Sequence, residues 1–389
     1  MKPNRPTRRH PDPALTTARV HRPGDASRAR SSDLSTRHKI NNAVVGVLTA
    51  SVTLMLASPG VTVHPAIRKP PRGSRPHATT TEAVPQYAPT IPASTTAPAS
   101  PTTTPPLSFV PSQQSLLPVC QGIDQPRRPA RIGPSLGCRI VAAYGNPLSK
   151  GMGILGRLPP DAMLADITKR TAEWQNADPA RTHRCALELI AISVQASPGP
   201  AGLYRAQMGP KLIDQVLQWA RNTNCLLILD MQVGHSTVEA ELPYLSPWLA
   251  QPDVALGLDP EWDMPPGVKP GTRIGTMDAN DINTAIATLS RLVDENHLPP
   301  KLLVVHRFLD HMVTHPENIH VPDQIRLVVN MDGFGTRAKK LSSYKIALRA
   351  MPTPLTGFKL FTLIDQPMLT PHEVLALALD PVPVFINYQ

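Results

Sequence analysis

Residues 253–262 read Asp-Val-Ala-Leu-Gly-Leu-Asp-Pro-Glu-Trp, an apolar run that ends in two acids and a tryptophan. The apolar residues predict a buried strand, which should stop at Pro260 because proline lacks the N–H that a central ladder needs. Side chains two apart on a strand share a face, so Asp259 and Glu261 are predicted on one side of the strand end. Paired carboxylates beside an aromatic ring are typical of sugar-cleaving sites.

Seven further apolar runs follow the same pattern, and amphipathic stretches lie between them. The predicted strands are 138–145, 185–194, 225–232, 253–259, 301–306, 325–332, 357–363 and 382–388. The predicted helices fall near 160–176, 208–222, 237–250, 278–297, 308–315, 337–350 and 371–379. Eight strands alternating with helices over about 250 residues predict an α/β fold of the (β/α)₈ TIM-barrel type. An open doubly wound sheet is the alternative.

Composition divides the 389 residues into four segments. Residues 1–39 are predicted to be a disordered, basic cytoplasmic tail, and 40–63 a transmembrane signal-anchor. Residues 64–118 are rich in Pro, Thr and Ala and predict a disordered linker, because such a segment cannot bury a core. Residues 119–389 form the predicted barrel domain.

The uncharged run from Ile40 to Val63 is long enough to cross about 30 Å of hydrocarbon at about 1.5 Å per residue. Arg37 and Lys39 flank its N-terminal side, so the positive-inside rule predicts a single-pass protein with an extracellular barrel domain. A cleaved signal peptide, which would leave the domain secreted, is the alternative.

The formal net charge of +10 is carried entirely by the residues before 119. Residues 119–389 contain 25 Lys and Arg against 25 Asp and Glu. The predicted barrel domain therefore shows no excess of the positive charge that a nucleic-acid surface needs, and we predict no nucleic-acid partner.

Four cysteines occur in the exported part of the chain, at Cys120, Cys138, Cys185 and Cys225. Four cysteines allow three connectivities. We predict the pairs 120–138 and 185–225, since the second and third strands should be neighbours.

Polar residues gather at the C-terminal ends of the predicted strands, where TIM barrels carry their active sites. We predict Glu261, Asp259 and Asp332 as catalytic residues. The predicted substrate-binding residues are Tyr144, Asn146, Asp230, Gln232, Trp262, His306, Asn330 and Lys359. Glu188 lies mid-strand and is left out of the predicted site.

Several of these residues also have a purely structural interpretation. Asp230 and Asp332 can instead cap helices or brace loops. His306 can be a core histidine, and Lys359 can be a solvent-facing side chain. Trp262 can be a loop plug instead of a sugar platform.

The Asp259-Pro-Glu261 pair on the fourth strand and the final Tyr388-Gln389 resemble the family-25 glycoside hydrolases, the muramidase type of lysozyme. That resemblance implies acid chemistry at Asp259 and Glu261. The first strand departs from it, because Tyr144-Gly-Asn146 stands where that family has an aspartate. The blocks at 144–149, 304–308 and 329–335 also resemble exported (β/α)₈ proteins of actinobacteria, which implies an extracellular setting.

The predicted function is that of a membrane-anchored, extracellular glycoside-hydrolase-like barrel acting on a cell-wall glycan or other polysaccharide. Glu261 would be the general acid, with Asp259 or Asp332 as base, nucleophile or oxocarbenium stabiliser. No cofactor and no metal are predicted. The alternatives are a non-catalytic glycan-binding or scaffold barrel, and a metal-dependent hydrolase using His306, Asp230 and Asp259.

One motif matches the glycine pattern of dinucleotide-binding loops, but its surroundings do not fit. The glycines of 151–156 form a literal G-x-G-x-x-G after the first strand. Leu158-Pro-Pro delays the helix, and the second strand does not end in the acid that would hold a ribose. Dinucleotide binding is therefore not predicted.

Overall fold

The computed structural model describes residues 136–389. The predicted tail, membrane segment and linker lie outside these residues. Among the helices of 136–389, none is long and apolar enough to cross a membrane.

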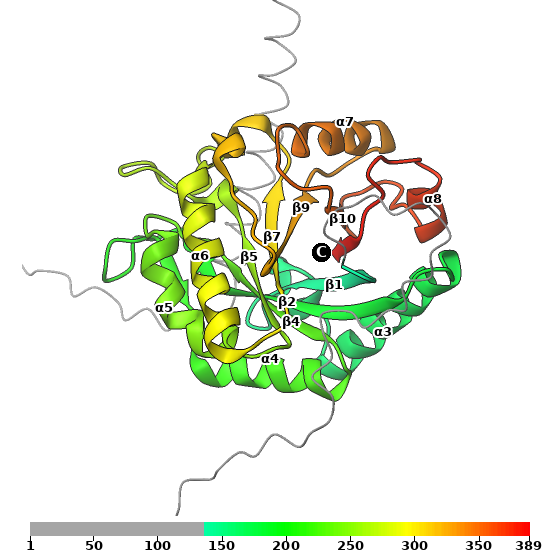
Figure 1. Ribbon diagram of the computed structural model, residues 1–389, viewed down its shortest axis with the longest axis horizontal. Coiled ribbons are helices and arrows are strands. Elements are labelled where there is room, and N and C mark those ends of the chain that lie inside the picture. Colours follow the sequence, from blue (N-terminus) through cyan, green and yellow to red (C-terminus); the bar gives the residue numbers. More distant parts are fainter. Residues whose placement is uncertain (1–135) are drawn as a thin grey trace, which may run out of the picture.

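Eight parallel strands close into a barrel (Figure 1). They are β1 Arg139–Gly145, β2 His183–Val194, β4 Leu226–Met231, β5 Val254–Leu258, β7 Lys301–Arg307, β9 Ile325–Met331, β10 Thr356–Leu360 and β11 Phe385–Tyr388. The circle closes because β1 pairs with both β2 and β11. The predicted barrel and its eight strands are confirmed, and an open doubly wound sheet is excluded.

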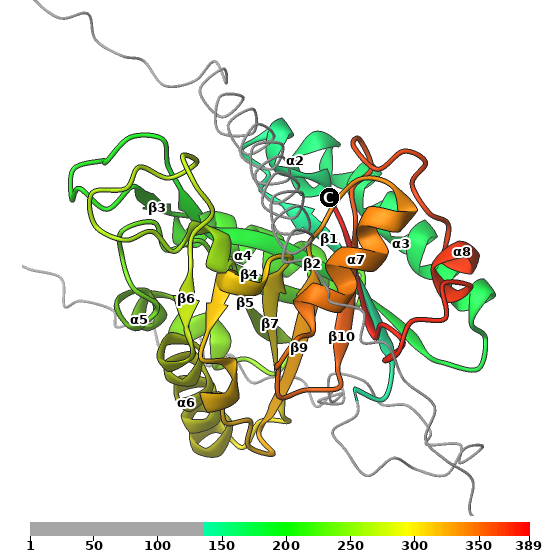
Figure 2. The ribbon, with the colours of Figure 1, turned by 90° about the horizontal axis from the view of Figure 1, so that it is seen from above.

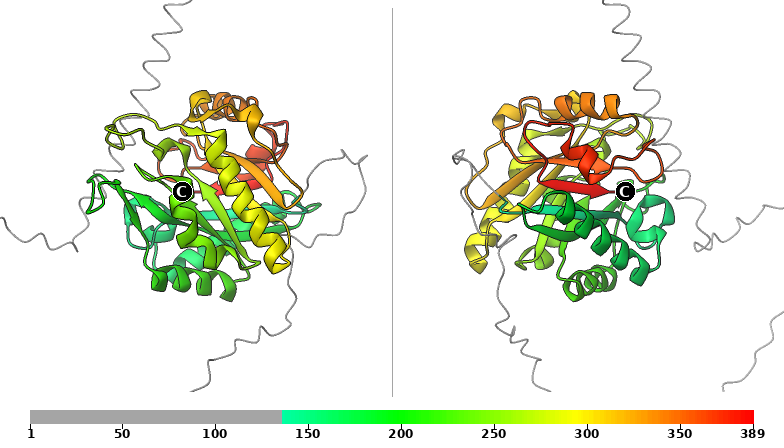
Figure 3. Two further views of the ribbon diagram at one scale, coloured as in Figure 1. Left: turned by 60° about the vertical axis from the view of Figure 1, so that its left-hand side comes forward. Right: turned by 90° about the vertical axis from the view of Figure 1, so that its right-hand side faces the viewer.

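Helices surround the strands (Figures 1 and 3). They are α2 Ile154–Arg157, α3 Pro160–Ala177, α4 Pro210–Asn222, α5 Val238–Leu249, α6 Ala279–Asn296, α7 Arg337–Ala347 and α8 Pro371–Leu375. Asp278 caps α6, since its side chain accepts from the backbone N–H of Asn280. Two short pieces, β3 Arg205–Gln207 and β6 Met277–Asp278, lie outside the barrel (Figure 2).

The predicted helix at 308–315 is wrong. The short 3₁₀ helix η3 Asp310–Met312 is followed by β8 Val313–Thr314, which pairs with β6. The Asp278 carboxylate accepts from the Thr314 hydroxyl at 2.6 Å, and His315 adopts a left-handed backbone with φ of 50°. Pairing with a distant strand takes the backbone groups that a helix would have used.

The strands alternate between two apolar environments. One set of side chains faces outward and packs against the helices, while the other fills the lower half of the barrel. The inner set includes Ile140, Ile228, Val304 and Phe385, all fully buried. Further along each strand the inward positions become polar. The apolar floor thus leaves the C-terminal half of the barrel for a polar site.

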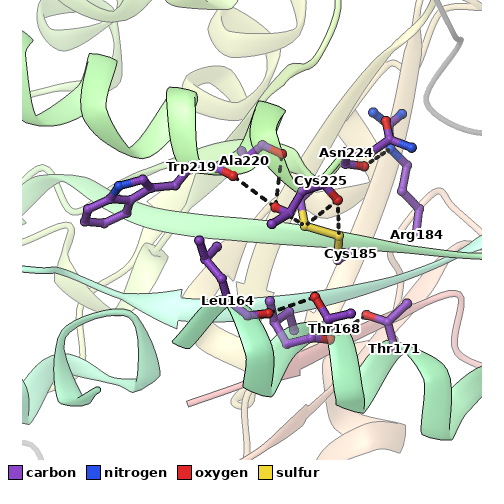
Figure 4. The surroundings of a disulfide bond; sticks show 11 residues. Leu164, Thr168, Thr171, Arg184, Cys185, Trp219, Ala220, Asn224 and Cys225 are labelled. Atoms are coloured by element: carbon purple, nitrogen blue, oxygen red, sulfur yellow. Dashed lines mark hydrogen bonds between the residues drawn. A yellow bond between two sulfur atoms is a disulfide. The ribbon is translucent and has the colours of Figure 1, made fainter. Parts of the chain in front are cut away.

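A disulfide joins Cys185 and Cys225 at the starts of neighbouring strands, with Cα atoms 4.7 Å apart (Figure 4). This predicted pair is confirmed. The predicted pairing of Cys120 with Cys138 lies outside the described residues, because Cys120 does.

Removing the 185–225 bridge is expected to destabilise the domain. The bond closes a loop with a sequence separation of 40, and such a link restricts the unfolded chain. The double variant Cys185→Ala/Cys225→Ala should lose about 2–4 kcal/mol of unfolding free energy, measured by chemical denaturation. A denaturation midpoint equal to that of the wild type would contradict this expectation.

Candidate functional site

His306 lies at the centre of a polar cluster inside the barrel. Its Nε2 is 3.1 Å from Glu188 Oε1 and 3.8 Å from Asp230 Oδ1. The second carboxylate oxygen of Glu188 accepts a hydrogen bond from the Asn387 amide. All four side chains are fully buried. They make up what we call the lower cluster, which β2, β4, β7 and β11 supply.

Glu188 and Asn387 are functional candidates that the sequence interpretation missed. Glu188 occupies the middle of an otherwise apolar strand, where a single acid reads as an isolated structural group. The available signal was the alternation of β2, since Glu188 shares a face with Ala186, a member of the inner core. Only the tertiary structure shows that Glu188 is hydrogen-bonded to His306 and Asn387 from other strands.

A tyrosine connects the Asp230 carboxylate of the lower cluster to the carboxylate of Asp259. The Tyr144 hydroxyl lies 2.7 Å from Asp259 Oδ2 and 3.0 Å from Asp230 Oδ2. The Gln232 amide donates to the same Asp259 oxygen at 3.0 Å. One hydroxyl proton therefore serves two buried acids, and each acid keeps its Oδ1 without a hydrogen-bond partner among the described residues.

Asp332 and Lys359 form an ion pair beside His306. The Lys359 ammonium is 2.9 Å and 3.1 Å from the two oxygens of Asp332, whose Oδ1 is 3.4 Å from His306 Nδ1. The Asn330 amide contacts the same ring nitrogen at 3.2 Å. We call Asp332, Lys359 and Asn330, together with Asp259 and the half-buried Glu261, the upper cluster; His306 lies between it and the lower cluster. Lys359 is buried, so its alternative as a solvent-facing side chain does not apply, whereas the functional role of His306 stays a prediction.

The sheet stops before Pro260, as predicted, but Asp259 and Glu261 follow it in a 3₁₀ turn and do not have the strand geometry that was expected of them. The strand stops at Leu258, and Pro260–Trp262 form the 3₁₀ helix η2. The fixed φ of Pro260 suits the first residue of this turn, so strand alternation does not describe Glu261. Asp259 still points into the barrel, where it meets Tyr144.

Electrostatics shift the pKa values of two carboxyl groups of the upper cluster in opposite directions. Burial, with the charges of Asp259 and Asp332, raises the pKa of Glu261 well above its ordinary value. Burial alone would also raise the pKa of Asp332, but the charges of Lys359 and His306 outweigh it and lower that pKa to about 2. Asp332 is therefore the stronger acid of the two.

The pKa shifts of His306 and Asp230 reflect the excess of acidic side chains around them. Burial disfavours the imidazolium form of His306, yet Asp259, Asp332 and Glu188 together raise its pKa well above the ordinary value. Burial and the charge of Asp259 raise the pKa of Asp230 well above its ordinary value. The two clusters together thus contain more acidic side chains than the two basic ones, His306 and Lys359, can neutralise.

Two of the predicted site residues have other surroundings. The Asn146 amide donates to the carbonyl of Ile190 and to Met208 Sδ, so its side chain braces the loop after β1. The Trp262 side chain is only 5% exposed. Its role as a sugar platform stays a prediction.

The glycines of the 151–156 motif serve packing. A Cβ on Gly153 would lie 2.3 Å from the carbonyl oxygen of Tyr144, and one on Gly156 would lie 2.0 Å from that of Asn146. These glycines let η1 Lys150–Met152 and α2 lie directly against the end of β1.

Gly257 makes room for the buried acids. A Cβ there would lie 2.6 Å from Asp230 Oδ1 and 3.3 Å from Glu188 Oε1. Gly257→Ala is therefore expected to cost about 1–3 kcal/mol of unfolding free energy through overpacking. Gly209→Ala is the control, since its Cβ would meet no heavy atom within 4 Å. Equal thermal stability of the two variants would show that the side chains of Asp230 and Glu188 move aside without cost, and would contradict the expectation.

Two sets of three side chains lie close enough to hold a metal ion, within the residues that the structure describes. They are Glu188, Asp230 and His306 in one set, and Asp259, His306 and Asp332 in the other. Carboxylate and imidazole ligands suit divalent first-row transition cations.

No family model matches the chain, and no curated protein matches it. Among solved structures, a β-1,4-D-mannanase from Cryptopygus antarcticus is 13% identical with a TM-score of 0.35, covering 64% of this chain and 84% of that chain. A likeness at this level carries no argument about the present site. The resemblance to family-25 glycoside hydrolases accordingly stays a prediction.

Proposed function

We propose that this protein is a glycoside hydrolase that cleaves a polysaccharide at the C-terminal mouth of its barrel. The observation that carries the proposal is the pair of environments at the barrel mouth: the Lys359 ammonium lies 2.9 Å from Asp332, whereas burial and the charges of Asp259 and Asp332 act on Glu261. Glycosidases need one carboxylic acid and one carboxylate at the same bond, and environments that push two pKa values apart assign these roles. The lowered pKa of Asp332 and the raised pKa of Glu261 meet that requirement.

Each group has a defined step. The protonated Glu261 donates its proton to the glycosidic oxygen, which leaves as a hydroxyl. The ionised Asp332 faces the positive charge that develops at the anomeric carbon and stabilises it directly or as a covalent partner. Water then forms the new bond to the anomeric carbon and gives up one proton, which restores the acid form of Glu261. Lys359 and His306 keep Asp332 ionised. Asp259, held by Tyr144 and Gln232, helps to keep Glu261 protonated.

The proposed setting is the outer face of the cell membrane. The uncharged run at 40–63 would anchor the chain, and the linker at 64–118 would carry the barrel toward a cell-wall glycan or another polysaccharide. Balanced charge in residues 119–389 favours a neutral polymer over a nucleic acid as the partner.

The test is release of reducing ends by the purified full-length protein from cell wall and from α-linked and β-linked polysaccharides. The double variant Glu261→Gln/Asp332→Asn is the blank, because it keeps the shape of both side chains and removes the acid–carboxylate pair. Release by the wild type alone supports the proposal. If wild type and variant are equally inert but both bind glycan, the barrel is a non-catalytic glycan-binding module and the proposed reaction is wrong.

A further inference from the structure

The lower cluster has the geometry of a cation site, separate from the acid pair of the proposed reaction. We propose that Glu188 Oε1, Asp230 Oδ1 and His306 Nε2 bind one divalent cation of the zinc and manganese class at the centre of the barrel. The site does not depend on the proposed glycoside hydrolysis. It gives a metal-binding role to Glu188, which takes no part in the proposed acid–carboxylate mechanism.

The ligand atoms converge at suitable separations. His306 Nε2 lies 3.1 Å from Glu188 Oε1 and 3.8 Å from Asp230 Oδ1, and the three atoms all lie within 4.8 Å of one another. Two atoms that bind a tetrahedral zinc at about 2.1 Å are about 3.4 Å apart, so small side-chain adjustments centre an ion among them. The ion takes the place of the proton on His306 Nε2.

Each ligand is oriented through its other polar atom. Asn387 donates to Glu188 Oε2, and the Tyr144 hydroxyl lies 3.0 Å from Asp230 Oδ2. His306 Nδ1 lies 3.4 Å from Asp332 Oδ1. A metal-bound histidine typically donates its second N–H to a carboxylate, and metal-binding carboxylates are themselves hydrogen-bonded. Each ligand residue thus has a further polar contact, while Glu188 Oε1 and His306 Nε2 share a hydrogen bond and Asp230 Oδ1 has no partner among residues 136–389.

An unpaired carboxylate oxygen of Asp230 supports a bound cation at this position. Asp230 Oδ1 is fully buried and has no hydrogen-bond partner among residues 136–389. An unpaired buried carboxylate oxygen is costly, and a bound cation satisfies it. Gly257 is the neighbouring residue on β5, and any larger side chain there would run into this oxygen. The glycine therefore makes room for an acid oxygen that lacks a hydrogen-bond partner.

The second possible set is the weaker candidate. Asp332 is already paired with the Lys359 ammonium at 2.9 Å, and that positive charge would repel a cation between Asp259 and Asp332. The lower cluster contains no lysine or arginine. Three protein ligands also leave a coordination position for water or a ligand oxygen, as in catalytic metal sites.

The experiment measures metal binding to the full-length protein after removal of metals with EDTA. Equilibrium dialysis against Zn²⁺ or Mn²⁺ should yield one ion per chain that Glu188→Gln and Asp230→Asn lose. Saturating metal should raise the wild-type Tm by about 5–10 °C at 100-fold excess over Kd. Neither ligand variant should show this shift. Glu261→Gln should bind metal like the wild type, which separates this site from the proposed reaction.

Asn387→Ala supplies an independent test, because it retains all three ligands and the net charge. Loss of a hydrogen bond to a metal-binding carboxylate typically weakens metal affinity about 10–100-fold. Unchanged affinity in Asn387→Ala together with unchanged binding by Glu188→Gln overturns the proposal. So does a wild type that binds neither ion. The Tm of each variant in EDTA reports whether it folds, and if the ligand variants do not fold, unchanged affinity in Asn387→Ala alone overturns the proposal.

Discussion

Glu261→Gln is expected to lower kcat by about 10²–10⁴ on any glycan that the wild type cleaves. Glutamine keeps the size of the side chain but has no acidic proton for the departing oxygen. The loss should be smaller on an aryl glycoside with an acidic phenol as leaving group, because that oxygen leaves without protonation. Steady-state kinetics on both substrates measure the difference.

The pH profile provides a second readout. Glu261 acts in its protonated form, so the wild-type rate should fall as pH rises through its raised pKa. Asp332 acts ionised, so the rate should also fall as pH drops toward about 2. Glu261→Gln should lose the alkaline limb and keep the acid limb. Glu239→Gln on the surface of α5 is the matched control, and the acid role fails if both variants keep the wild-type profile.

Lys359→Met is expected to be the most destabilising single change in the site, by about 3–5 kcal/mol. Lys359 is 2% exposed and its ammonium holds both oxygens of Asp332, so methionine leaves a buried carboxylate with a partner removed. Chemical denaturation at neutral pH measures the loss. Lys339→Met, at an exposed position in α7, should change the unfolding free energy little.

The sign of the pH dependence distinguishes a lost ion pair from lost packing. In the wild type the folded-state pKa of Asp332 is lowered to about 2 from the ordinary 3.8, so its stabilising contribution is present above about 4. That contribution disappears as pH falls toward 2. In Lys359→Met burial favours the protonated acid, so stability should instead recover on acidification. Adding Asp332→Asn should restore much of the loss, whereas an additive double variant would contradict the ion-pair account.

Much of the fold follows from local pattern. Each barrel strand is an apolar run whose side chains alternate between helices and barrel interior, and the amphipathic stretches that became α3, α4 and α6 lie between such runs. The one predicted helix that failed, at 308–315, lies where β8 pairs with β6. That pairing joins segments far apart in the chain, so no local pattern reveals it.

The site was only partly accessible to the same reasoning. Acids at strand ends are conspicuous, so Asp259, Asp230 and Asp332 could be predicted as neighbours at the barrel mouth. Glu188 could not, because its partners His306 and Asn387 come from strands on other parts of the barrel wall. The turn at Pro260 also gave Glu261 a position that strand alternation does not describe.

The amino-acid sequence by itself determined the strands, their order and the end of the barrel where polar groups gather, because alternation and chain order are local properties. Only the tertiary structure decided in which direction the pKa of each acid is shifted. That outcome depends on burial and on charges brought within a few ångströms, such as Lys359 against Asp332. It also placed Glu188, Asp230 and His306 around one point, which no spacing along the chain encodes.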